Sequence, residues 1–242
     1  IEDAADNDFS TTIADGDLGS VSVDGDAPDL SSVAATNGAY GVGELLTITV
    51  TWDEAVEVTG TPTLTLSNSD IATYVSGDES VALVFTTTIA EDDDDSADLS
   101  VSSYSGTITD SAGGAAAAAT GDLGSVTVDG DAPDLASVAA PDSTYGIGES
   151  FAITVTWDEA VTVTGTPSLT LSNSATVDYT SGSTTTALVF TYTVAEGHTD
   201  SSDLTVSSIA ANGGTIQDAA DNDFSTTMAG GDLGTVIVDG DT

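Results

Sequence analysis

The sequence predicts an all-β protein made of tandem antiparallel β-sandwiches, and three observations support this fold class. Valine, isoleucine and leucine alternate with threonine at every second position in several stretches. Glycine, asparagine, aspartate and proline separate these stretches, as expected for turns between short strands. A long pattern also occurs twice along the chain, which indicates two modules of domain size.

The first clear strand is predicted around Leu46. From Leu46 to Trp52 every second residue is large and apolar and the residues between are threonines, as a strand with one buried face requires. The stretch from Phe151 to Trp157 repeats the pattern, so both tryptophans are expected in a core. Further apolar positions bring each module to about seven strands; in the first module they are Leu64, Leu66, Val81, Leu83, Phe85, Leu99, Val101, Ile108, Val126 and Val128.

The module boundaries follow from a repeated Val-Asp-Gly-Asp-Ala-Pro-Asp-Leu motif. It begins at Val23 and Val128, and its first four residues return at Val238, so the spacings are 105 and 110 residues. We therefore assign residues 27–131 and 132–242 to two complete modules. Residues 1–26 match the end of the chain from Ile216 onward and are predicted to be the C-terminal strands of a preceding, incomplete module. Upstream sequence or a neighbouring molecule would complete that module, and both alternatives remain open.

The charge of the chain excludes several classes of partner. Forty-one Asp and Glu residues face no Lys or Arg, which gives a formal net charge of −41 and no intramolecular salt bridge to a basic side chain other than the single histidine. Such a chain repels nucleic acid and anionic membrane surfaces. No apolar run approaches the roughly 20 residues that span a bilayer. Because cysteine is absent, disulfides and thiolate metal sites are excluded.

Clustered carboxylates at the module boundaries predict a site for a hard cation. Successive strands of an antiparallel sandwich alternate in direction, so three acidic elements should converge where the linker enters the second module. Ca²⁺ binds six to eight oxygen atoms from carboxylates, carbonyls and water, whereas Mg²⁺ demands a tighter octahedral geometry. The predicted Ca²⁺ ligands at this junction are Asp129, Asp131 and Asp134 of the linker, Asp158 and Glu159 at the strand end, and Asp218 of a late turn.

The same elements precede the first module. The equivalent ligand set there is Asp24, Asp26, Asp29, Asp53, Glu54 and Asp110. The alternative is that each Asp-Gly-Asp is a turn with solvated side chains, since these residues dominate turns for conformational reasons alone.

The series Val50 to Val56, Gly60 to Leu66, Ala82 to Phe85 and Thr107 to Gly114, with its counterparts in the second module, resembles the bacterial immunoglobulin-like repeats of giant secreted adhesins and cell-surface proteins. The resemblance implies Ig-like sandwiches, a secreted or cell-surface location, and a role as a structural extender whose junctions are rigidified by calcium. The partners it implies are neighbouring modules of the same or identical chains. The usual Asp-x-Ala-Gly-Asn turn is altered here at Asp110 and at Asp218.

Other acidic or polar groups are given simpler interpretations. The run from Glu91 to Asp95 is interpreted as a solvated loop because the second module has a different sequence there. His198 is expected at the surface, with no second histidine or cysteine to complete a transition-metal site. Asp53 and Glu54 are neighbours in a strand and should point to opposite faces, which argues against a catalytic carboxylate pair. No enzymatic activity is predicted.

Two alternative functions remain beside the structural one. The first is a ligand-binding adhesin module that holds a glycan, a surface polymer or ice through exposed threonines such as Thr47, Thr49 and Thr51. Threonine also suits exposed strand positions without any ligand. The second is a self-assembling sheath or surface-layer subunit, in which residues 1–23 add strands to a neighbouring molecule.

Overall fold

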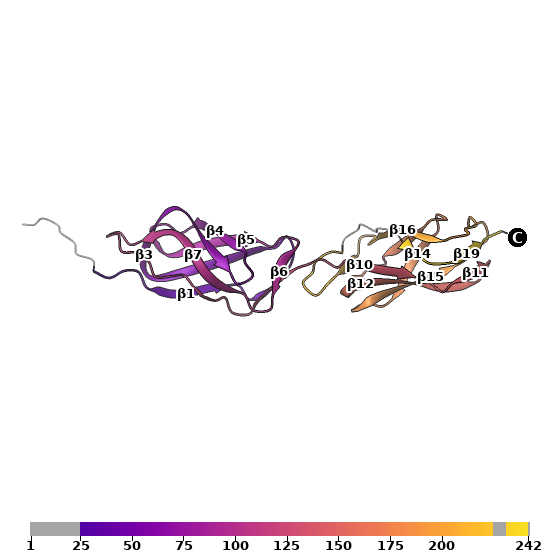
Figure 1. The fold of residues 1–242 in the computed structure, drawn as a ribbon, viewed down its shortest axis with the longest axis horizontal. Helices are drawn as coiled ribbons and strands as arrows, with labels where there is room; N and C mark the ends of the chain where they lie inside the picture. Colours follow the sequence, from indigo (N-terminus) through magenta and orange to yellow (C-terminus); the bar gives the residue numbers. More distant parts are fainter. Residues whose placement is uncertain (1–24, 225–230, 242) are drawn as a thin grey trace, which may run out of the picture.

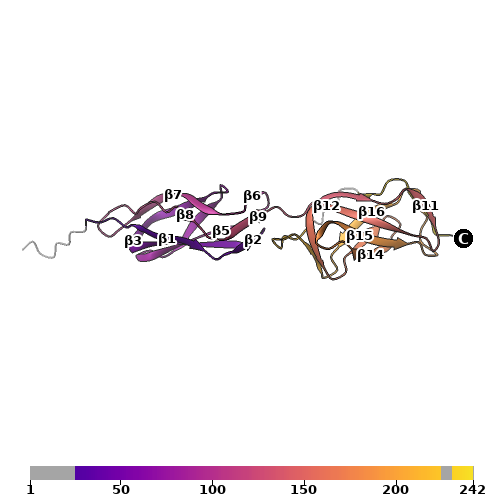
Figure 2. The ribbon, with the colours of Figure 1, turned by 90° about the horizontal axis from the view of Figure 1, so that it is seen from below.

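In a computed structural model of the chain, the described residues are 25–224 and 231–241, and they form two β-sandwiches that follow one another end to end (Figures 1 and 2). The predicted all-β class of tandem β-sandwiches is confirmed. Among the described residues there is no helix long and apolar enough to cross a membrane. The incomplete module predicted for residues 1–26 lies outside the described part except for its last two residues.

The first sandwich is organised around one long strand, β3 (Leu45–Leu66). The first half of β3 pairs with β1 and β5 and its second half pairs with β7 and β4, so β3 contributes to both layers. A short parallel pair, β2 with β9, and the contact of β6 with β9 extend the sandwich toward the linker. The other strands are β1 (Leu30–Ala35), β2 (Gly38–Tyr40), β4 (Ile71–Ser76), β5 (Ser80–Thr88), β6 (Asp93–Ser96), β7 (Ser100–Thr109), β8 (Gly121–Asp122) and β9 (Val126–Gly130).

The second sandwich repeats this plan with β12 (Ser150–Thr164) in the place of β3. The first half of β12 pairs with β10 and β15, and its second half pairs with β17. The pair β11 with β19 is parallel, as is its counterpart in the first module. The other strands are β10 (Leu135–Ala139), β11 (Ser143–Gly146), β13 (Ser168–Leu171), β14 (Thr176–Ser181), β15 (Thr185–Thr193), β16 (Thr205–Ala210), β17 (Thr215–Gln217), β18 (Gly231–Asp232) and β19 (Val236–Asp239).

Each sandwich has its own hydrophobic core. Trp52 is 1% exposed in one core and Trp157 is 2% exposed in the other, which confirms both predictions. Two-residue alternation sends the intervening threonines to the outer face. Val81 was expected to be inward-facing but is 45% exposed, because it stands at the very start of β5 beyond the regular ladder.

Strand pairing brings the acidic elements of the second module together. Thr162 of β12 lies opposite Gln217 of β17 in an antiparallel register. The chain therefore leaves β17 at Asp218 beside the part of β12 that contains Glu159. The linker between β9 and β10 enters at the same end of this sandwich, as the ribbon shows (Figure 1).

Candidate metal centre

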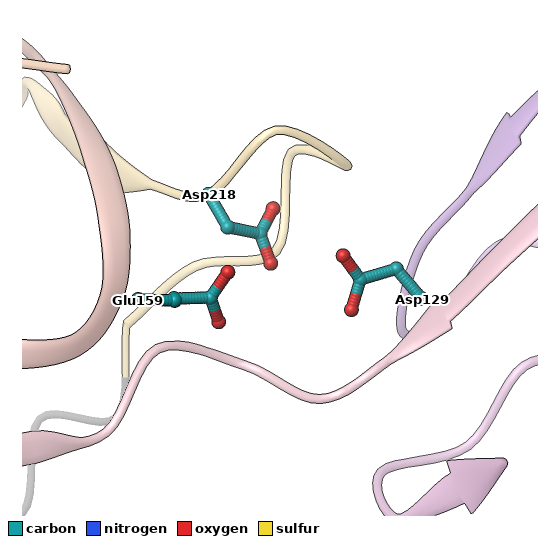
Figure 3. A group of neighbouring side chains, drawn as sticks. All are labelled: Asp129, Glu159 and Asp218. Carbon is teal, nitrogen blue, oxygen red and sulfur yellow. The ribbon is translucent and has the colours of Figure 1, made fainter. Parts of the chain in front are cut away.

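Three carboxylates from three separate elements meet at the junction of the modules (Figure 3). Asp129 lies in β9 of the first module, Glu159 in β12 of the second, and Asp218 in the turn after β17. One carboxylate oxygen of each residue lies within 4.8 Å of the others. We refer to these residues as the junction triad.

A turn holds the carboxylate of Asp218 in place. Its Oδ1 accepts hydrogen bonds from the backbone N–H groups of Ala220 at 2.7 Å and Asn222 at 2.9 Å, and its Oδ2 accepts one from the Asn222 side-chain amide at 2.8 Å. Asp218 is only 3% exposed. Its acceptor atoms are thus positioned by the fold before any ligand arrives, which is the usual way in which a binding group is preorganised.

The electrostatics of the triad favour binding of a positive ligand. Burial raises the pKa of Glu159 to about 7, and the nearby carboxylates of Asp218 and Asp129 add to this effect. Burial and then Asp218 also raise the pKa of Asp129 above its ordinary value. The sequence contains no Lys or Arg that could relieve the repulsion. A cation or a proton is therefore the available means of neutralising the cluster.

The donor set consists of three carboxylates, and its fit to the common divalent ions can be compared. Hard carboxylate oxygens suit both Ca²⁺ and Mg²⁺, but Ca²⁺ accepts irregular arrangements and completes its shell with carbonyls and water. A hollow of about 340 Å³ borders Asp129 and Ala220 and gives water access to the junction. Asp129, Glu159 and Asp218 would hold the ion, which would supply positive charge shared between two modules.

The other predicted ligands of this junction do not join the triad. Asp158 uses its Oδ1 to accept the backbone N–H of Asp134 at 2.9 Å, which fixes the linker against β12. The backbone N–H of Asp131 donates to Oδ1 of Asp129 at 3.4 Å. Asp158 and Glu159 are consecutive in a strand and point to opposite faces, so only one of them can face Asp218.

The junction before the first module is only partly described. Asp24 lies outside the described residues, and Asp53 accepts the N–H of Asp29 at 2.9 Å, as Asp158 does in the second module. Asp110 forms the same turn as Asp218, but its buried Oδ2 has no hydrogen-bond partner among the described residues. The described residues of this junction, which include Asp26 and Glu54, contain no second cluster of three carboxylates.

Two loop interpretations are refined by the structure. Part of the acidic run belongs to β6, and Asp93 accepts the backbone N–H of Ala90 at 2.6 Å. In the second module Nδ1 of His198 accepts the equivalent N–H of Ala195 at 3.1 Å. The His198 ring is partly buried and stacks on Tyr192 at a centroid distance of 5.5 Å, so this loop histidine also has a packing partner.

Comparisons with known proteins give a structural likeness and no family. No family model matches the chain, and no curated protein matches it either. Among solved structures, a fragment of the I-band of titin is similar, with a TM-score of 0.38 and 10% sequence identity over 88% of this chain. The match spans 66% of the titin fragment.

One residue of the junction was missed at the level of sequence. Asn222 was noted only as part of an altered turn, yet its side chain contacts the linker of the first module. Comparison of the three copies of this turn could have identified it, because the fifth residue differs among them. That residue is Asn7 in the first copy, Gly114 in the second and Asn222 in the third.

Proposed function

We propose that this chain is a structural extender of a repetitive extracellular surface protein, either an adhesin or a filament, and that Ca²⁺ bound at its module junctions makes it rigid. The junction triad is the single observation on which this proposal rests. Asp129 comes from one module and Glu159 and Asp218 from the next, so one ion at the triad would tie the two modules together.

The arrangement of the modules supports a spacer. Each sandwich has a separate core, and the two follow one another along one axis, so added modules extend the length of the chain (Figure 2). Interfaces between such domains are normally small, and relative motion is their default. A metal bridge at the linker counters that motion at the place where it begins.

The charge supports a location outside the cell. In a chain of formal charge −41 the carboxylates repel one another, and dissolved salt weakens this repulsion. The screening is strong at high ionic strength, where the Debye length falls to a few Å. Extracellular calcium-binding modules typically have dissociation constants of about 10⁻⁴ to 10⁻³ M. A site built from three carboxylates is expected in this range.

The outer threonines give less support to a ligand-binding role. On the outer face of the second sandwich, Ser150 and Thr193 hydrogen-bond to each other at 2.7 Å, and Thr180 bonds to Thr191 at 3.1 Å. Hydroxyls that satisfy one another across strands have less capacity for a ligand. Strand addition by residues 1–23 concerns residues outside the described part.

Small-angle scattering of the full chain tests the proposal. In Ca²⁺ we expect an extended profile with less bending at the junction than in EDTA at equal ionic strength, where hydrogen bonds such as those of Asn222 are the contacts that remain. Mg²⁺ should restore less rigidity than Ca²⁺. Scattering profiles and melting curves that do not respond to EDTA would refute the calcium proposal.

A charge-removing variant of the triad, Glu159→Gln, extends this experiment, and Glu57→Gln is its control. Glu57 is exposed on β3 and lies outside the triad, so its replacement removes the same charge elsewhere. The response to calcium should disappear in the first variant and persist in the second.

A further inference from the structure

A network of hydrogen bonds also joins the modules, and it requires no ion. It is centred on Asn222, which is 3% exposed. The side-chain amide nitrogen donates to the linker carbonyl oxygens of Asp129 at 3.2 Å and Asp131 at 3.0 Å. The amide oxygen of Asn222 accepts the backbone N–H of Val42, in the loop between β2 and β3 of the first module. One side chain of the second module thus contacts both the linker and a loop of the first.

The orientation of this amide is determined by its partners. The linker carbonyl oxygens of Asp129 and Asp131 and a carboxylate oxygen of Asp218 lie near the amide nitrogen. The backbone N–H of Val42 lies near the amide oxygen. A flipped amide would place a donor against the Val42 N–H and an acceptor against three oxygens. The amide nitrogen has two hydrogens, so two of its three acceptors share one of them, and the observed orientation satisfies these groups whereas the flipped one does not.

The first module has a socket that fits this side chain. Gly41 is buried, and a Cβ at this position would collide with Oδ1 of Asn222 and lie 2.6 Å from the carbonyl oxygen of Ala220. At the equivalent Gly146, which faces away from this junction, the nearest atom to such a Cβ is Oε2 of Glu149 at 3.9 Å. The absence of a side chain at Gly41 is therefore what permits the close approach of the two modules.

We infer that Asn222 and Gly41 form a lock between consecutive modules that operates without a bound cation, and that the fifth residue of the turn decides which junctions have it. Gly114 occupies this position in the first module and offers no side chain to a preceding linker. Asn7 occupies it in the turn sequence near the start of the chain. The array therefore combines locked junctions with junctions that rely on other contacts.

The lock differs from the proposed calcium bridge in a measurable way, because its effect persists in EDTA. The chain has no cysteine, so two spin labels can be attached after Ser76→Cys and Ser181→Cys, which are exposed positions of the two modules. Pulsed electron–electron double resonance then measures the distribution of distances between the modules.

In EDTA we expect a single narrow distance peak for the labelled parent, which calcium narrows further, and loss of that peak for Asn222→Gly. Gly41→Ala should give the same loss from the other side of the junction, without any change in the second module. The matched controls are Asn212→Gly and Gly146→Ala, which should keep the narrow peak. Asn212 also donates two amide hydrogen bonds, but both acceptors, Thr166 and Ser168, lie in its own module.

The outcomes separate the lock from the calcium bridge. An unchanged narrow peak in EDTA for either Asn222→Gly or Gly41→Ala, with both modules folded by calorimetry, would overturn the lock. If calcium then restores the narrow peak of Asn222→Gly, the bridge acts independently of the lock. If calcium has no effect on any variant while the lock variants lose the peak, the bridge fails and the lock stands.

Discussion

The charge-removing variant Glu159→Gln gives the sharpest test of the junction triad. It keeps the size and shape of the side chain and removes one of three negative charges. Two opposite effects are expected at pH 8. Without a divalent cation the variant should be more stable than the parent, because repulsion is relieved. With calcium the parent should gain stability that the variant does not gain.

The size of the first effect follows from the geometry. Two carboxylates at the upper separation of 4.8 Å repel by about 0.9 kcal/mol in bulk water and by about 3.5 kcal/mol at an effective dielectric constant of about 20. Only the pair Glu159 and Asp218 lies within the second module. Because Glu159 is partly exposed, we take the effect to lie nearer the lower value, and about 1 kcal/mol corresponds to about 4 °C in melting temperature.

The second effect follows from mass action. A ligand at a hundredfold excess over its dissociation constant stabilises the folded state by about 2.7 kcal/mol. For a module of this size that amounts to about 10 °C. Differential scanning calorimetry in EDTA and in saturating calcium measures both effects in the parent, in Glu159→Gln and in the control Glu57→Gln. Equal calcium increments in all three chains would show that the triad does not bind the ion.

Three further results are expected. The pKa of Glu159 is raised from 4.5 to about 7, so the cation-free module loses stability as pH rises through this interval. Over the same interval the calcium affinity should rise about tenfold per pH unit and level off above pH 7, because the ion binds the ionised carboxylate. Titration calorimetry measures this affinity. Gly182→Ala should lower the melting temperature more than Gly213→Ala. Gly182 has φ +112° and a Cβ there would collide with the Ala187 carbonyl, whereas Gly213 has φ +80° and open space around a Cβ. Equal losses would contradict the steric argument. Phe190→Ala removes a fully buried ring, costs about 3 to 5 kcal/mol, and should shift only one of two calorimetric transitions, since the cores are separate.

The fold could be predicted because its main signal is local. The alternation from Leu46 to Trp52 states which side chains are buried without knowledge of their partners. The count of about seven strands was lower than the nine in the first module, because β2 (Gly38–Tyr40) and β6 (Asp93–Ser96) contain little apolar alternation and exist through pairing with β9. The length of β3 was also not predicted, because its pairing with β7 is irregular between Thr59 and Thr63.

The site was predictable in its location but not in its membership. Antiparallel connectivity placed the linker, the end of a strand and a late turn together, and Asp129, Glu159 and Asp218 do converge. Alternation along β12 could have separated Asp158 from Glu159 in advance. That Asp158 binds the N–H of Asp134 depends on a backbone group, which sequence patterns do not reveal.

The comparison of the two turns shows how one residue changes what a junction requires. Asp218 and Asp110 each use Oδ1 to accept two backbone N–H groups of their own turn. Oδ2 of Asp218 is satisfied by the Asn222 amide, whereas Gly114 leaves the buried Oδ2 of Asp110 without a partner among the described residues. An unsatisfied buried acceptor is costly. A cation or an ordered water would therefore stabilise the turn at Asp110 more than it would stabilise the hydrogen-bonded Oδ2 of Asp218.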